Sequence, residues 1–268
     1  AKHRLFYTLL RLKLPLYKRD EHPEGLGFKF LADDPTSSQK VMTGHDEGII
    51  TVALAEADDA EREQRRTAMG EPYRTLLGHF RHEIGHWYWD ILIRDNPAVL
   101  AECRALFGDD TEDYGQALQN HYNNGPKPNW QDEYVSSYAG SHAWEDFAET
   151  WAHYLHIIDT LEVGGSYGIA IQPRLDRDGI LTTDLELDVY NPDTRIQEIA
   201  DAWLALSRNV AAVLANVGWG GLVLGAAGLW FAWRDRVRAP AAWRIAALAV
   251  SVILATLLFQ SLIPAALA

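Results

Sequence analysis

Apolar side chains between residues 71 and 94 recur every three or four positions, which is the period of a helix with one buried face. These positions are Leu77, Phe80, Ile84, Trp87 and Ile91. The same spacing returns over residues 142–158, where Ser141 stands in the place of a helix cap. The pattern therefore predicts two long amphipathic helices that pack through their apolar faces.

Shorter sequence patterns outside the two long helices predict a strand, a further helix and loops. Residues 47–58 begin with alternating β-branched side chains and predict a strand, and we expect residues 49–54 to form the edge of a sheet beside the first long helix. Residues 1–19 have the amphipathic pattern of a helix and not that of a signal peptide. Residues 163–197 are rich in Gly, Pro and Asp and predict mostly loops. Residues 1–208 thus predict one α+β domain.

The end of the chain has a different composition. Residues 209–233 and 245–268 contain no charged side chain, and each run is long enough to cross a bilayer. The intervening residues 234–244 contain four arginines and one aspartate. This pattern predicts a hydrophobic helical hairpin over residues 209–268, with a transmembrane location favoured over the alternative of a hairpin buried in a soluble domain.

The net charge and the cysteine content limit which partners and which cellular compartment we expect. The net charge of −13 argues against a basic surface, so we expect no nucleic-acid partner. The single cysteine, Cys103, excludes an internal disulfide and fits a reducing compartment. We therefore expect a cytoplasmic domain that residues 209–268 can anchor to a membrane. The topology stays open, because the arginine-rich loop favours the opposite orientation. Oligomeric state is also left open.

A chemical motif lies within the first long helix. His82 and His86 are four residues apart, so both imidazoles can reach one cation at ~2.0–2.1 Å. Glu83 is turned about 100° from His82, where it can act as a general base on water at the metal. HExxH on a helix therefore predicts a hydrolytic zinc site. Two plain core histidines are the alternative.

The third ligand has to come from elsewhere. The extended form of the motif requires a glycine and a further histidine where this chain has Trp89 and Leu92, so that class is excluded. The other class takes a glutamate from a later helix, and Glu145 fits it. Glu149, one turn further on, is placed to accept a hydrogen bond from a ligand histidine and to fix its tautomer.

These motifs, with residues 43–90 and 136–162 around them, resemble a bacterial family of zinc-binding metallopeptidases of the gluzincin type. The resemblance covers about residues 2–209 and does not reach the hydrophobic hairpin. It implies a zincin-like fold, in which a small sheet packs on the HExxH helix and on a second, glutamate-bearing helix. It also implies Zn²⁺ on His82, His86 and Glu145, and a peptide or protein substrate. We expect an extended peptide to pair with the strand at residues 49–54.

A tyrosine seven residues before Glu145 adds to the resemblance. The order Tyr138, Glu145, Glu149 is similar to the corresponding stretch of anthrax lethal factor, another HExxH gluzincin, in which the tyrosine faces the zinc. The resemblance implies that Tyr138 donates a hydrogen bond to the oxyanion formed during peptide hydrolysis. The alternative is a tyrosine packed at the helix entrance with its hydroxyl on a backbone group.

The sequence therefore predicts a zinc-dependent peptidase with Glu83 as its general base. Two alternatives stay open. One is a membrane-tethered zinc-binding module without catalysis, which a fourth protein ligand would favour. The other is a zinc hydrolase of a non-peptide amide or ester, which the residues do not distinguish from a peptidase.

Overall fold

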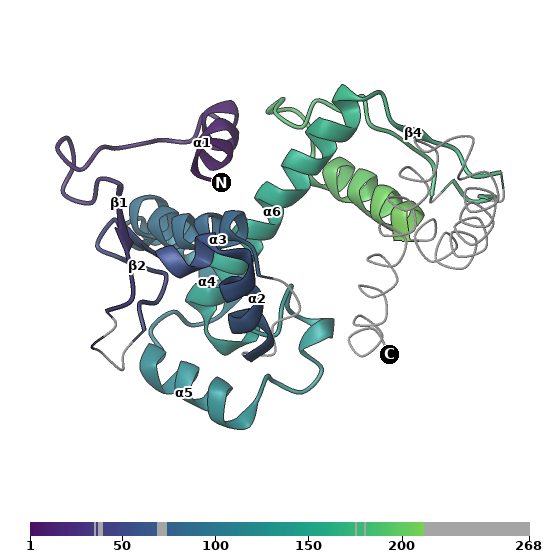
Figure 1. The fold of residues 1–268 in the computed structure, drawn as a ribbon. Helices are drawn as coiled ribbons and strands as arrows, with labels where there is room; N and C mark the ends of the chain where they lie inside the picture. Colours follow the sequence, from purple (N-terminus) through teal and green to yellow (C-terminus); the bar gives the residue numbers. More distant parts are fainter. Residues whose placement is uncertain (35, 37–39, 69–73, 175, 180, 212–268) are drawn as a thin grey trace, which may run out of the picture. The chain divides into compact units, whose positions relative to one another are not determined.

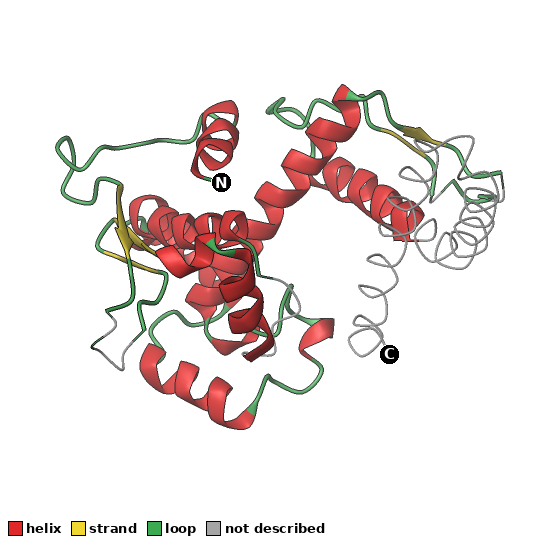
Figure 2. Ribbon diagram, viewed as in Figure 1, coloured by secondary structure: helices red, strands yellow, loops and turns green. Residues whose placement is uncertain are grey.

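A computed structural model describes residues 1–34, 36, 40–68, 74–174, 176–179 and 181–211 (Figures 1 and 2). Its elements are α1 (Lys2–Arg11), β1 (Gly27–Leu31), β2 (Gly44–Asp46), β3 (Ile49–Ala53), η1 (Leu54–Ala57), α2 (Asp59–Ala68), α3 (Leu76–Trp89), η2 (Asp90–Arg94), α4 (Pro97–Phe107), α5 (Tyr114–Asn124), η3 (Trp130–Asp132), η4 (Ala139–Ser141), α6 (Ala143–Ser166), β4 (Ala170–Ile171) and β5 (Thr183–Asp184). Residues 196–211 are also helical.

The chain divides into two compact units. The first comprises residues 1–162 and 189–191, and the second comprises residues 163–188 and 192–268. The first unit is a helix-rich α+β domain with a small sheet, which fits the expected zincin-like fold at the level of architecture. The boundary at residue 208 stays a prediction.

The sheet of the first unit has the order β1-β3-β2. β1 runs parallel to β3, and β2 runs antiparallel to it. The expectation that residues 49–54 form an edge strand is therefore wrong: β3 is the central strand, and β2 and β1 lie at the two edges. Glu47 and Gly48 have φ of 44° and 79°, so they make a two-residue hairpin turn that folds β2 back onto β3.

The predicted apolar faces form the core of the first unit. On α3, Phe80, Ile84 and Trp87 are buried, and they pack with residues from α1, β3 and α6. Thr75 caps α3 by accepting a hydrogen bond from the backbone N–H of Gly78 at 3.0 Å. The helix predicted over residues 71–94 is thus confirmed from Leu76 onward, with a π-helical turn, η2, at its end.

α3 and α6 approach each other closely at Gly85, within the HExxH motif. A Cβ atom on Gly85 would lie 3.0 Å from the Cα of Ala148 and 3.3 Å from the Cβ of Trp151. Because Gly85 and Ala148 are small, the helix backbones come within a distance that larger side chains would prevent. This crossing determines which polar side chains of the two helices meet.

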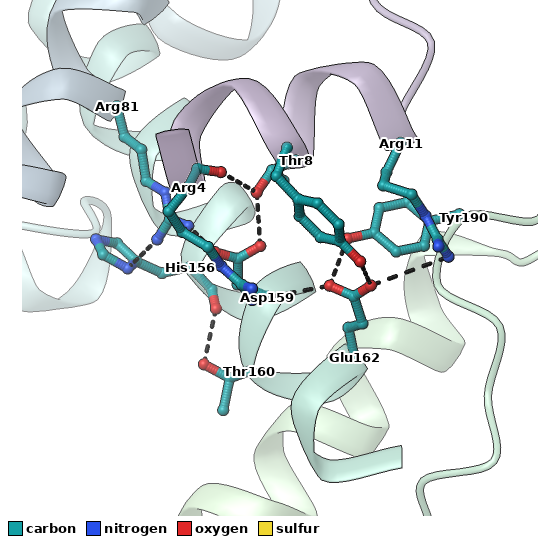
Figure 3. Close-up of polar contacts among 10 residues, drawn as sticks. Arg4, Thr8, Arg11, Arg81, His156, Asp159, Thr160, Glu162 and Tyr190 are labelled. Carbon is teal, nitrogen blue, oxygen red and sulfur yellow. Dashed lines mark hydrogen bonds and ion pairs between the residues drawn. The ribbon is translucent and has the colours of Figure 1, made fainter. Parts of the chain in front are cut away.

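α1 is attached to α6 by a polar network (Figure 3). Asp159 accepts hydrogen bonds from Arg4 Nε at 2.9 Å and from Thr8 Oγ1 at 2.6 Å, and it also pairs with Arg81 of α3. One turn further along α6, Glu162 accepts a hydrogen bond from Tyr190 Oη at 2.9 Å. The Asp159 carboxylate therefore has hydrogen-bond donors from two helices, α1 and α3.

The second unit is described as far as residue 211. β4 and β5 pair antiparallel. Gly165, near the end of α6, lies so close to Leu185 that a Cβ atom would be 2.3 Å from the Leu185 carbonyl oxygen. Apart from residues 209–211, the predicted hydrophobic hairpin lies outside the described residues. Within the described ranges, no helix combines the length and the apolar character needed to cross a bilayer.

Candidate metal centre

Three predicted ligands meet where α3 crosses α6. The Nε2 atoms of His82 and His86 are 3.1 Å apart. Glu145 Oε2 lies 3.0 Å from the first of these nitrogens and 3.5 Å from the second. Two imidazoles four residues apart on one helix and a carboxylate from another helix therefore converge on one point.

The triangle has the dimensions of a zinc site. Tetrahedral ligands that each lie ~2.0–2.1 Å from a zinc ion are separated from one another by about 3.3 Å. Glu145 is only 1% exposed, and its Oε2 is a buried oxygen that accepts no hydrogen bond from the described residues. A buried carboxylate oxygen without a donor is costly, and a cation bound there would satisfy it. The residues present therefore fit Zn²⁺.

Glu149 orients one of the two histidines. Its Oε1 atom lies 2.7 Å from His82 Nδ1, so the imidazole donates its Nδ1 proton to this carboxylate. The Nε2 lone pair of His82 then points toward His86 and Glu145. This arrangement is the one that the sequence led us to expect for Glu149.

The electrostatics of the site favour positive charge. Burial alone would lower the pKa of His82, but the carboxylates of Glu145 and Glu149 outweigh burial and raise this pKa well above its ordinary value. Burial would raise the pKa of Glu145, yet His82 and His86 hold it well below its ordinary range. The negative charge that raises the pKa of His82 also attracts a divalent cation, which would bind at Nε2 in place of a proton.

Two further predicted residues lie close to the ligands. Glu83 is 7% exposed and follows His82 on α3. The ring centroid of Tyr138 lies 6.1 Å from that of His82. Burial, followed by the charge of Glu145, raises the pKa of Tyr138, so its phenol keeps its proton. Glu83 thus adjoins His82 on α3 and the Tyr138 ring packs near the His82 ring, and the roles expected of the two residues stay predictions.

Other neighbours were not predicted from the sequence. Tyr114, at the start of α5, donates a hydrogen bond from its hydroxyl to Glu145 Oε1 at 2.6 Å. His142 is 5% exposed and caps α6, because its Nδ1 accepts the Trp144 N–H at 3.0 Å. The expected cap, Ser141, instead donates its hydroxyl to the Tyr138 carbonyl. No motif in the sequence relates Tyr114 to Glu145, which is 31 residues away.

A family model described as "Putative zinc-binding metallo-peptidase" matches residues 1–223. The chain belongs to this family. The match extends past Asn209, where the resemblance seen in the sequence ends, and stops before residues 224–268. Membership in this metallopeptidase family agrees with the site at which His82, His86 and Glu145 meet.

Three mycobacterial proteins are similar to this chain. Uncharacterized proteins of Mycobacterium bovis and of two strains of Mycobacterium tuberculosis are each 46% identical to it over 220 residues. The match covers 81% of this chain but only 60% of each relative, so the chain spans well under the full length of these proteins. No solved structure gives a match.

A cleft of about 480 Å³ is lined in part by His45 and Trp144, and none of the three candidate ligands lines it. Both residues lie near His86: the centroid of the Trp144 ring is 4.0 Å from that of the imidazole, and the centroid of the His45 ring, which is roughly parallel to it, is 6.4 Å away. His45 belongs to β2, the edge strand of the sheet. Trp144 and His45 thus connect His86 to a cleft and to an edge strand.

Proposed function

We propose that the protein is a zinc-dependent metallopeptidase that hydrolyses peptide bonds at the His82–His86–Glu145 centre. The observation that carries this proposal is the triangle of 3.0, 3.1 and 3.5 Å formed by the three ligand atoms. Three protein ligands leave a fourth tetrahedral position for the reaction, whereas structural zinc sites are usually closed by four protein ligands. Family membership points to the same class of activity.

Each group around the triangle has a separate role in the proposed hydrolysis. Zinc at this site would supply Lewis acidity, both toward the carbonyl of the scissile bond and toward the attacking water. The Glu83 carboxylate accepts a proton from that water as its oxygen attacks the carbonyl carbon. Glu83 then delivers the proton to the amide nitrogen, so that the C–N bond breaks and a neutral amine leaves.

Tyr138 is the proposed donor to the carbonyl oxygen. Negative charge develops on that oxygen during attack, and a fixed O–H donor stabilises it more in the transition state than in the substrate. Its ring position near His82 and its protonated phenol support this role. Glu149 holds the His82 imidazole through Nδ1, so that its Nε2 lone pair is directed at the metal.

An extended peptide is the proposed substrate, and β2 is the strand along which we expect it to lie. β2 is an edge strand, and its residue His45 stacks on His86. Main-chain hydrogen bonds to an edge strand hold a peptide in an extended form that exposes each carbonyl in turn. The peptide would then pass along the cleft beside His86.

The test is Glu83→Gln, with Glu102→Gln on the surface of α4 as the matched control. The variant is expected to bind zinc with wild-type stoichiometry and to cleave a peptide library roughly 10²–10⁴-fold more slowly, because the general base is lost. The control is expected to match the wild type in both measurements. Cleavage by Glu83→Gln at the wild-type rate would contradict the mechanism. Zinc binding without cleavage by the wild type would favour a binding module or a non-peptide hydrolase.

A further inference from the structure

We infer that Tyr114 is a positioning residue of the metal centre, whose hydroxyl holds one oxygen of Glu145 and leaves the other for the metal. This inference rests on the proposed zinc site, and it assigns a role to α5, an element outside both motif-bearing helices.

The two oxygens of Glu145 have different surroundings. Oε1 accepts the hydrogen bond from the Tyr114 hydroxyl at 2.6 Å. Oε2 lies 3.0 and 3.5 Å from the Nε2 atoms of His82 and His86 and accepts no hydrogen bond from the described residues. A carboxylate with one oxygen engaged by a donor presents the other oxygen alone. The geometry therefore favours a metal bound through a single oxygen of Glu145.

The Tyr114 ring is itself held in place. Its edge-to-face contacts place it 5.3 Å from the His142 ring and 5.5 Å from the Trp144 ring. Trp144 in turn packs on His86 at 4.0 Å. His142 Nε2 donates to the carbonyl of Glu112 at 3.2 Å, two residues before Tyr114, which fixes the backbone from which the phenol projects.

The support of Glu145 parallels that of His82. Glu149 holds His82 through the ring nitrogen that does not face the metal position, and Tyr114 holds Glu145 through the oxygen that does not face it. Partners of this kind typically alter metal affinity by 10–100-fold when they are removed. Tyr114 is therefore expected to contribute to zinc affinity without contacting the zinc.

This contact gives α5 its connection to the metal centre. α5 begins at Tyr114, is capped by Asp113 and contains no fully buried residue. A surface helix of this kind gains little from packing its own side chains into a core. Its first residue is the point at which α5 contacts a ligand, so zinc binding and the position of α5 are expected to depend on each other.

Tyr114→Phe tests the inference, because it keeps the ring contacts and removes only the hydroxyl. Tyr122→Phe is the matched control, since Tyr122 lies on the same helix with 60% of its surface exposed. Zinc dissociation constants are measured by competition with a chromogenic chelator on the full chain. We expect affinity to fall by roughly 10–100-fold in Tyr114→Phe and to stay at the wild-type value in Tyr122→Phe.

A second readout separates positioning from general loss of structure. Cobalt(II) substituted for zinc reports ligand geometry through its visible spectrum. Release of Oε1 lets both oxygens of Glu145 approach the metal, so the Tyr114→Phe spectrum should show a higher coordination number than the wild type. Wild-type affinity or an unchanged spectrum in this variant would overturn the role of Tyr114. A wild-type chain that binds no zinc would overturn the proposed function itself.

Discussion

Two clusters of buried charged side chains lie between α3 and α6, and they differ in how their carboxylates are satisfied. At Asp159, Oδ1 accepts a hydrogen bond from Thr8, and Oδ2 contacts the guanidinium groups of Arg4 and Arg81 (Figure 3). At Glu145, Oε1 is held by Tyr114, while Oε2 faces two imidazole nitrogens and accepts no hydrogen bond from the described residues. We call the first cluster closed, because both of its carboxylate oxygens have donors, and the second open, because one of its carboxylate oxygens has none among the described residues.

The difference separates a cluster that we expect to be structural from one that we propose binds a metal. The two clusters share their helices, and Arg81 of the closed cluster directly precedes His82 of the open one. A carboxylate with donors on both oxygens needs no further partner, and its removal leaves uncompensated buried charge. An open cluster keeps a buried acceptor unsatisfied, which is the state expected of a site that binds a cation. The two clusters should therefore respond to different experiments.

The largest expected effect comes from breaking the closed cluster. Asp159→Ala should lower the free energy of unfolding by about 3–5 kcal/mol, because Arg81 is 1% exposed and would lose its carboxylate. Urea denaturation of the metal-free protein measures this, with the exposed Asp178→Ala as the control, expected within about 0.5 kcal/mol of the wild type. His86→Ala, in the open cluster, should cost less than half as much. Equal losses for Asp159→Ala and His86→Ala would contradict the distinction.

Zinc should act only through the open cluster. At a free concentration 100 times its dissociation constant, it should stabilise the wild type by about 2.7 kcal/mol, because the ligand binds the folded chain alone. His86→Ala should show no such gain, since it removes one of the three ligands. Thermal unfolding with and without zinc measures both values. A gain of the same size in His86→Ala would place the metal elsewhere.

Low pH should disrupt another buried ion cluster, which is centred on Glu56. Its side chain lies 2.6 Å from Arg74 Nη2 and 3.4 Å from His79 Nδ1. Burial would raise the pKa of Glu56, but His79 and Arg74 lower it to about 2. A depressed pKa stabilises the folded state above the unfolded-state value of ~4.3, and this stability is lost as the pH falls toward 2.

Glu56→Gln should therefore remove roughly 3 kcal/mol of stability at neutral pH and flatten the decline between about pH 4 and pH 2. Chemical denaturation of the wild type and of Glu56→Gln across this range compares the two slopes. Parallel curves for the two proteins would show that Glu56 does not carry this part of the acid sensitivity.

The smallest effect is expected at the rim of the Asp159 cluster. Tyr7 donates its hydroxyl to Glu162 but is 40% exposed. Interactions of this kind in contact with water contribute little, so Tyr7→Phe should leave the free energy of unfolding in urea close to the wild-type value. A loss as large as that of Asp159→Ala would mean that the network depends on its exposed rim.

The helices and the ligand positions could be predicted from local sequence. The apolar face of residues 71–94 and the spacing of His82, Glu83 and His86 both follow from the period of one helix. Glu145 and Glu149 lie one turn apart on a second helix with its own apolar face. In each case the information lies within a few turns of a single element.

Features that depend on partners distant in the sequence could not be predicted. Ile49–Ala53 has the pattern of a strand, but only the pairing of Gly27–Leu31 and Gly44–Asp46 makes it central. Tyr114 meets Glu145 across 31 residues, and the contact depends on how His142 anchors the backbone at Glu112. Strand order and polar contacts between elements are set by tertiary packing, which the spacing of residues within one element does not encode.

The central claim is that His82, His86 and Glu145 bind one zinc ion. Anomalous diffraction at the zinc edge from crystals of the zinc-loaded full chain tests this most directly. The account predicts one peak ~2.0–2.2 Å from the two Nε2 atoms and from one oxygen of Glu145, with the other oxygen held by Tyr114. Zinc-loaded crystals without a peak between these side chains, or with the three ligands turned away from one another, would contradict it.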